Sequence, residues 1–189
     1  MAVITINEVS ASSATASTEE VRVAFEEHQQ ELTWLAEFLT DDQYIASMCL
    51  AGGRTLSDNK NKERSLYPEN VEKWPQEATI CSALELKRTR IAELASMYES
   101  LDPAGADLPL PPDAIELVVR ESDLIRLRLD SIGRFVLILR GIERHSVDFI
   151  ACLLGISKHA VEAAYSHAIG LLEVIYCQTV LESYECAAA

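Results

Sequence analysis

The segment from Ser146 to Leu172, SVDFIACLLGISKHAVEAAYSHAIGLL, constrains the fold of this chain more than any other. Ser146 is a favourable N-cap, and the apolar residues after it recur at the three- and four-residue spacing of one helical face. Gly155 then suits the left-handed conformation that ends a helix, and Ser157 is placed to cap the next one. The spacing predicts two helices joined by a turn of about three residues, the signature of a helix-turn-helix.

The apolar positions of this segment define the interior that we expect. The first helix buries Val147, Ile150, Ala151 and Leu154, and Ile156 fills the turn. The second helix buries Val161, Ala164 or Tyr165, Ala168 and Leu172. Because capping, glycine and apolar positions all match at fixed spacing, a helix-turn-helix is favoured over a plain helical hairpin.

The rest of the chain is also helical in character. Ala, Leu and Glu, which favour helix, are frequent, and 189 residues contain only seven glycines and six prolines. Alternating β-branched residues occur only at 3–6, so we predict an all-α protein. The periodicity predicts helices over 19–39, 42–51, 75–101, 113–128 and 130–142, with the last helix running to about Tyr184. The polar stretch 52–70 is predicted to be a loop.

Four of the six prolines lie between Leu101 and Ala114. Proline removes a backbone donor and fixes φ, so we expect no helix to cross this segment. It divides the chain into two small helical domains. The predicted organisation is a flexible tail at 1–18, a helical domain at 19–101, a proline-rich linker at 102–113 and the helix-turn-helix domain at 114–189.

Charge and motif content exclude several classes of function. The net charge of −14 argues against unaided, non-specific DNA binding, because affinity for phosphate comes mainly from Lys and Arg. The five cysteines have no metal-ligand or disulfide spacing, which fits a reducing cytoplasm, and no signal peptide or membrane span is expected. No phosphate loop or nucleophile elbow occurs, so we expect neither an enzyme nor a bound cofactor or metal.

Residues 129–172 resemble the promoter-binding region four of extracytoplasmic-function sigma factors. The helix before that family's motif reads Leu-Pro-x-x-x-Arg-x-x-Phe-x-Leu-Arg, and similar places are held here by Leu129, Arg134, Leu137, Leu139 and Arg140. Residues 25–42 and 74–90 resemble two helices of region two, in the same order along the chain. The resemblance implies a cytoplasmic transcription regulator that binds RNA polymerase with its first domain and promoter DNA with its second.

The chain departs from the family at both contact surfaces. Where the family has an acidic stretch that docks on polymerase, this chain has the uncharged residues 45–51, which include the expected contacts Ala46, Ser47 and Leu50. Three cationic positions of the recognition helix become Glu162, Ala164 and His167. The positions expected to face DNA are Ser157, Lys158, His159, Glu162, Ala163, Ser166 and His167, with Arg144 before the motif and Lys87, Arg88 and Arg90 in the first domain.

These departures leave two functions open. The recognition helix and its surroundings offer only about 2–3 phosphate contacts, so promoter reading would depend on affinity supplied by polymerase. The alternative is a degenerate protein-interaction module that keeps the fold and no longer binds DNA directly. For Lys87, Arg88 and Arg90, pairing with Glu85 and Glu93 is an equal alternative to DNA contact. An anti-sigma partner and a homodimer through the apolar stretch 171–181 also remain open.

Overall fold

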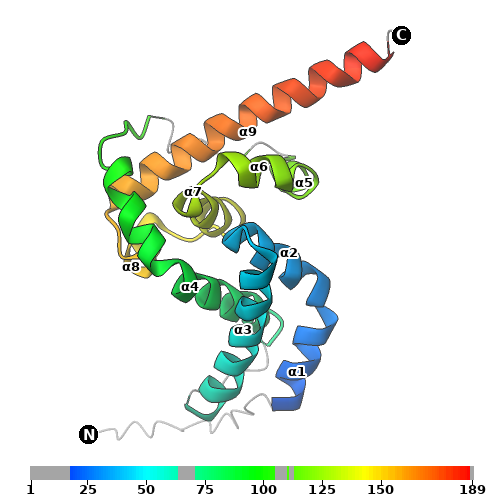
Figure 1. The fold of residues 1–189 in the computed structure, drawn as a ribbon, viewed down its shortest axis with the longest axis vertical. Helices are drawn as coiled ribbons and strands as arrows, with labels where there is room; N and C mark the ends of the chain where they lie inside the picture. The colour runs from blue at the N-terminus through cyan, green and yellow to red at the C-terminus, as the bar shows by residue number, and fades with distance from the viewer. Residues whose placement is uncertain (1–17, 64–70, 105–109, 111–112, 188–189) are drawn as a thin grey trace, which may run out of the picture.

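The computed structural model describes residues 18–63, 71–104, 110 and 113–187 of the chain, and these residues form an all-α fold, as the composition predicts (Figure 1). The flexible tail predicted for the N-terminus lies outside the described residues up to position 17. No helix within the described ranges combines the length and the apolar character needed to cross a bilayer.

The N-terminal half contains α1 (Thr18–Glu27), α2 (Gln29–Thr40), α3 (Gln43–Glu63) and α4 (Trp74–Tyr98). The helix predicted over 19–39 is therefore two helices, which meet at His28. Between α2 and α3, Asp41 adopts the left-handed conformation with φ 57°, and its N–H donates to the Glu37 carbonyl. The Asp42 carboxylate then accepts from the Ile45 N–H at 2.9 Å and caps α3, which confirms the predicted break.

The prediction of a loop over 52–70 is wrong for residues 52–63, which belong to helix α3. Gly52 and Gly53 sit where α3 crosses α4, and a Cβ on Gly52 would lie 2.4 Å from the Ser82 hydroxyl. A Cβ on Gly53 would lie 3.4 Å from the Thr79 nitrogen. The two glycines therefore serve close helix packing instead of a turn, and tertiary contact overrides their poor helix propensity.

The C-terminal half contains α5 (Ala114–Arg120), α6 (Ser122–Arg128), α7 (Ser131–Val136), the π-helix η2 (Leu137–Ile142), α8 (Val147–Leu154) and α9 (Lys158–Ala187). The two helices predicted over 113–128 and 130–142 are each divided. Glu121 separates α5 from α6, and the second helix widens into π geometry at Leu137. Asp130 caps α7 by accepting from the Gly133 N–H at 2.9 Å.

The turn between α8 and α9 has the predicted local geometry. Ser146 accepts from the Phe149 N–H at 3.2 Å, and Ser157 accepts from the Ala160 N–H at 3.0 Å. Gly155 is left-handed, with φ 70°. The residues predicted to form the interior belong to one buried cluster: Ile150, Ala151, Leu154, Val161, Ala164, Tyr165, Ala168 and Leu172, with Val147 and Ile156 packed against it. Whether this hairpin reads DNA stays a prediction.

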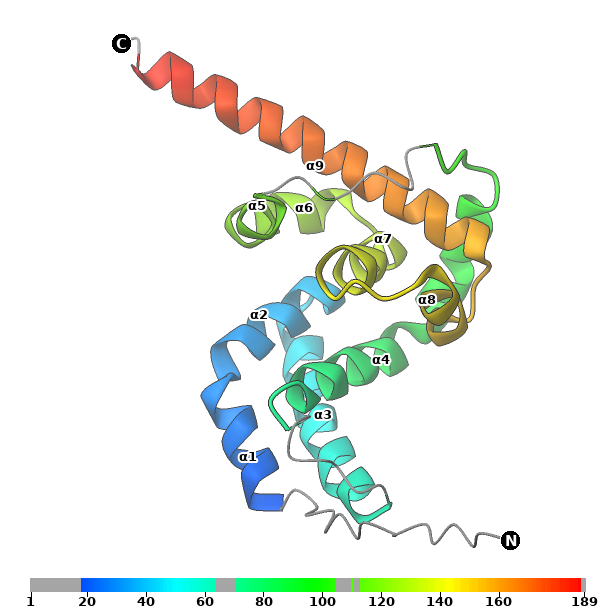
Figure 2. The same cartoon turned by 180° about the vertical axis from the view of Figure 1, so that it is seen from behind.

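Helix α4 contacts elements of both halves. It packs on α2 and α3 and also on α7, α8 and α9 (Figures 1 and 2). One buried cluster accordingly runs from Leu35 and Phe38 in the first half to Phe135 and Val161 in the second. The division into two domains remains a prediction from the proline-rich segment, which no described helix crosses.

The left-handed turn at Gly155 generates a stability prediction. Gly155→Ala should lower the free energy of unfolding by about 1–2 kcal/mol, because no heavy atom lies within 4 Å of the added Cβ and the cost is that of the backbone conformation. Gly170→Ala is the matched control within α9. It should raise stability by about 0.5–1 kcal/mol, because Gly170 has an ordinary helical φ and open space around it. Urea unfolding of both variants measures the two free energies of unfolding. Equal changes in Gly155→Ala and Gly170→Ala would contradict a left-handed conformation at Gly155.

Candidate nucleic-acid interface

The residues expected to face DNA at the start of α9 differ in exposure. Ser157, Lys158 and His167 are exposed, whereas His159, Glu162 and Ser166 are half-buried. Ala163 is only 2% exposed and belongs to the buried cluster, so it supports the packing of α9 and does not reach solvent. The structure therefore brings most of these residues to one end of α9 and separates Ala163 from them.

The chain itself lies on this part of α9. The His159 Nε2 is 3.0 Å from the carbonyl oxygen of Leu101, which accepts its hydrogen. The Ser166 hydroxyl donates to the carbonyl oxygen of Ala104. Both carbonyls belong to the segment after α4, defined here as the covering segment, Leu101–Ala104. In this conformation, two of the side chains expected to bind DNA are engaged by the protein.

The charge around this end of α9 is close to balanced. Lys158 forms an exposed ion pair with Asp148 of α8, which raises the lysine pKa, and Glu162 adds to the effect. Arg144 is exposed in the turn before α8 and has a left-handed φ of 59°. Against Lys158 and Arg144 stand the carboxylates of Asp148, Glu162 and the exposed Asp102 of the covering segment, so phosphate attraction is weak.

The cations of α4 lie on a different surface. Arg88 pairs with Glu85 at 2.9 Å and Arg90 pairs with Glu93 at 3.1 Å, all with exposed side chains. These are the helix-surface pairs given above as the alternative to DNA contact. Exposed pairs contribute about 0–1 kcal/mol, so they do not prevent exchange of the carboxylate for a phosphate.

The expected polymerase contacts on α3 are divided between core and surface. Ala46 is 2% exposed and Leu50 packs against the buried clusters, whereas Ser47 is exposed. Cys49 is fully buried, and burial raises its pKa to about 11. The loss of charge in 45–51 is therefore explained for Ala46 and Cys49 by packing. The exposed residues of this stretch are Ser47, Met48 and Ala51, and the exposed Tyr44 directly precedes it.

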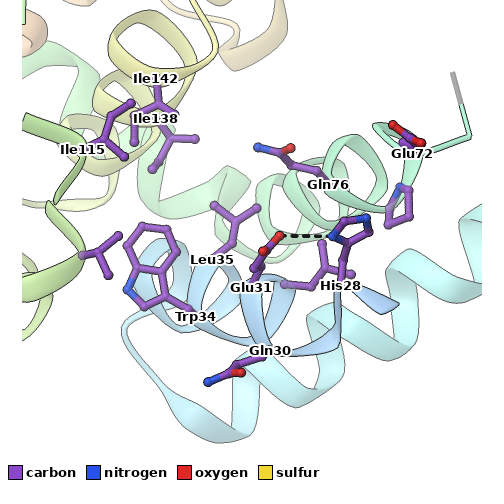
Figure 3. A pocket seen from close by; sticks show the side chains of 13 residues that line it. His28, Gln30, Glu31, Trp34, Leu35, Glu72, Gln76, Ile115, Ile138 and Ile142 are labelled. Carbon is purple, nitrogen blue, oxygen red and sulfur yellow. Dashed lines mark hydrogen bonds and ion pairs between the residues drawn. The ribbon is translucent and has the colours of Figure 1, made fainter. Parts of the chain in front are cut away.

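Sequence analysis did not identify an apolar hollow of about 600 Å³ between the two halves. Figure 3 shows Trp34 and Leu35 of α2 across from Ile115, Ile138 and Ile142 of the C-terminal half. At one end, the His28 Nδ1 lies 3.2 Å from the Glu31 carboxylate. The lining combines residues about 80–110 positions apart, and no local pattern could have connected them.

The described residues hold no group of His, Cys, Asp or Glu that could bind a metal ion. Comparison with protein-family models, curated proteins and solved structures gives no significant match.

The contacts of the covering segment generate a second prediction. The double variant His159→Ala/Ser166→Ala should be cleaved about fivefold to a hundredfold faster than the wild type within residues 101–113. Each lost hydrogen bond contributes roughly 0.5–1.5 kcal/mol, and local opening sets the rate of cleavage. Limited proteolysis with mass-spectrometric mapping measures the rate. His167→Ala, exposed on the same helix, is the control, and an equal acceleration in it would show that the covering contacts do not hold the segment.

Proposed function

We propose that this protein is a sigma-factor-like transcription regulator that binds RNA polymerase and reaches promoter DNA through the α8–α9 hairpin. The observation that supports this function best is the hairpin itself. Two capped helices meet at the left-handed Gly155, and the apolar positions shared with region four point inward. The resemblance of residues 25–42 and 74–90 to region two adds the polymerase-binding half.

In this function the protein positions DNA and has no catalytic residue of its own. Lys158, His167 and Arg144 contact phosphates, and Ser157 and Ser166 donate hydrogen bonds. DNA reaches this surface after the covering segment leaves α9. The two hydrogen bonds to be broken contribute about 1–3 kcal/mol together, an amount that binding to polymerase can offset.

A second function has its own support. The ends of His159 and Ser166 are engaged by the covering segment, and Lys158 is neutralised by Asp148. The outward polar groups of this helix already have partners within the protein, so DNA is not required to satisfy them. These contacts favour the alternative given above, a protein-interaction module that keeps a sigma-like scaffold.

A charge-reversal experiment separates the two functions. Glu162→Lys/His167→Arg adds three positive charges, counting neutral histidine, to the outward face of α9. If the native protein reads promoters with polymerase, a mobility shift at low salt gives a ternary complex with the wild type, and the variant strengthens it by about tenfold or less. If the native protein no longer binds DNA, the wild type gives no mobility shift and only the variant binds DNA.

The matched control for this experiment is Glu173→Lys/Gln178→Arg, which adds the same charge to exposed positions further along α9. Equal gains in both variants would show non-specific attraction. Absence of a wild-type complex with polymerase and DNA would contradict the proposed function.

The polymerase contact is tested on the outward face of α3. Met48→Glu should reduce retention on immobilised core polymerase by about tenfold, because Met48 is 47% exposed beside Ser47 and a buried interface would desolvate the new charge. Val23→Glu, on the exposed side of α1, is the control. Retention unchanged in Met48→Glu would show that polymerase does not bind this face.

A further inference from the structure

A second hollow, of about 580 Å³, lies between the α2–α3 turn, α4 and the α6–α7 region. Its cationic lining comes from three helices and consists of Lys87, Arg90, Arg126, Arg128 and Arg134. The Arg of α7 matches a position of the sigma family, but neither arginine of α6 belongs to a motif in the sequence. This cluster is defined here as the basic hollow.

The basic hollow carries an excess of positive charge in an acidic protein. Three carboxylates line it, those of Asp41, Asp42 and Asp130, against five cations. The lining alone has two more cations than carboxylates, but Glu93 and Asp123, which do not line the hollow, pair with Arg90 at 3.1 Å and with Arg126 at 2.8 Å. Asp42 and Asp130 are also occupied as helix caps, accepting from the N–H groups of Ile45 and Gly133. Lys87 and Arg128 are therefore the lining cations whose donors remain available to an anion.

Two of the arginines have buried donors without acceptors. The Arg134 side chain is 5% exposed; its Nη1 donates to Asp41 at 3.2 Å, while its Nε has no partner. The Arg126 Nε is also buried without a hydrogen bond, and the nearest Asp41 oxygen is 4.0 Å away. A buried guanidinium donor without an acceptor is costly, so an additional acceptor at this place would be stabilising.

Lys87, on α4, is also affected by the positive charges gathered in the hollow. Its pKa is lowered first by partial burial and then by the charges of Arg134 and Arg90, whereas Asp41 and Asp42 act in the opposite direction. Lys87 and Arg128 form no ion pair with other described residues. An arriving anion would therefore meet cations that are not yet neutralised.

We propose that the basic hollow binds a small molecule that carries a phosphate or diphosphate group, such as a nucleoside diphosphate. The volume falls in the range typical of small-molecule sites, about 300–1,000 Å³. A planar guanidinium group can bind two phosphate oxygens at once, and arginines of α4, α6 and α7 line the hollow.

The depth of Arg134 favours a small phosphate compound over duplex DNA. Arg134 lines the hollow and its side chain is only 5% exposed, so the broad convex surface of a duplex is poorly shaped to contact it. A terminal phosphate can enter. Because the site combines α2, α4, α6 and α7, its occupant would also join the two halves of the protein. This proposal does not depend on DNA reading by α9.

Isothermal titration of the full chain tests the proposal, with inorganic diphosphate, ADP and adenosine as separate ligands. Diphosphate and ADP should bind, and adenosine should not, because the recognised chemistry is the charged group. Lys87→Gln and Arg128→Gln should each weaken binding by about tenfold. Arg88→Gln and Arg120→Gln are the matched controls on α4 and α5; both are exposed, lie outside the hollow and should leave the affinity unchanged.

Three results would overturn the proposal. The first is absence of diphosphate and ADP binding by the folded wild type. The second is equal weakening in the control variants, which would assign the effect to general charge. The third is tighter binding of a duplex that competes with diphosphate and is lost in Lys87→Gln, which would assign these cations to nucleic acid. Thermal unfolding of each variant confirms that affinities are compared between folded proteins.

Discussion

The ion pair between Arg134 and Asp41 is the constraint on which the arrangement of the two halves depends. All nine residues from Ser131 to Leu139 are buried, and Arg134 lies among them. A guanidinium in such a place is strongly unfavourable without a carboxylate. The turn between α2 and α3 supplies one, 3.2 Å away. Asp41 holds a left-handed conformation that costs a non-glycine residue about 1–2 kcal/mol.

The pair fixes where α7 lies relative to the N-terminal helices, and α4 extends this connection. Helix α4 packs on α2 and α3 and also on α7, α8 and α9. Tyr98, near its C-terminus, is buried, and burial together with Asp130 raises its pKa. The helix therefore connects the packing of the two halves, and the covering segment that follows it contacts His159 and Ser166 of α9.

The parts of the fold that depend on short-range chemistry could be predicted from the sequence. Ser146, Gly155 and Ser157 specify caps and a turn through neighbours within four residues, and Asp42 does the same for α3. The extension of α3 could not be predicted, because Gly52 and Gly53 are helical on account of Ser82 and Thr79, almost thirty residues away. The π geometry at Leu137 had no local signal either.

The candidate site, like the fold, has features that could be predicted from the sequence and features that could not. The positions of Ser157, Lys158 and His167 on the outward side of α9 follow from helical periodicity. The hydrogen bonds of His159 and Ser166 to Leu101 and Ala104 span about sixty residues, so no periodicity predicts them. The basic hollow likewise gathers arginines from helices whose mutual placement is set by the core. Sequence analysis found the residue types but not the surfaces that they share.

The length of α9 has a mechanical consequence. Its thirty residues make a rod of about 45 Å, and both ribbon views show its last turns extending past the other helices (Figures 1 and 2). Its first turns form the hairpin and meet the covering segment. Buried residues hold α9 against the other helices as far as Ile175. The turns beyond Ile175 are therefore a rigid continuation of the packed part, and their direction is set by the same contacts that hold the hairpin.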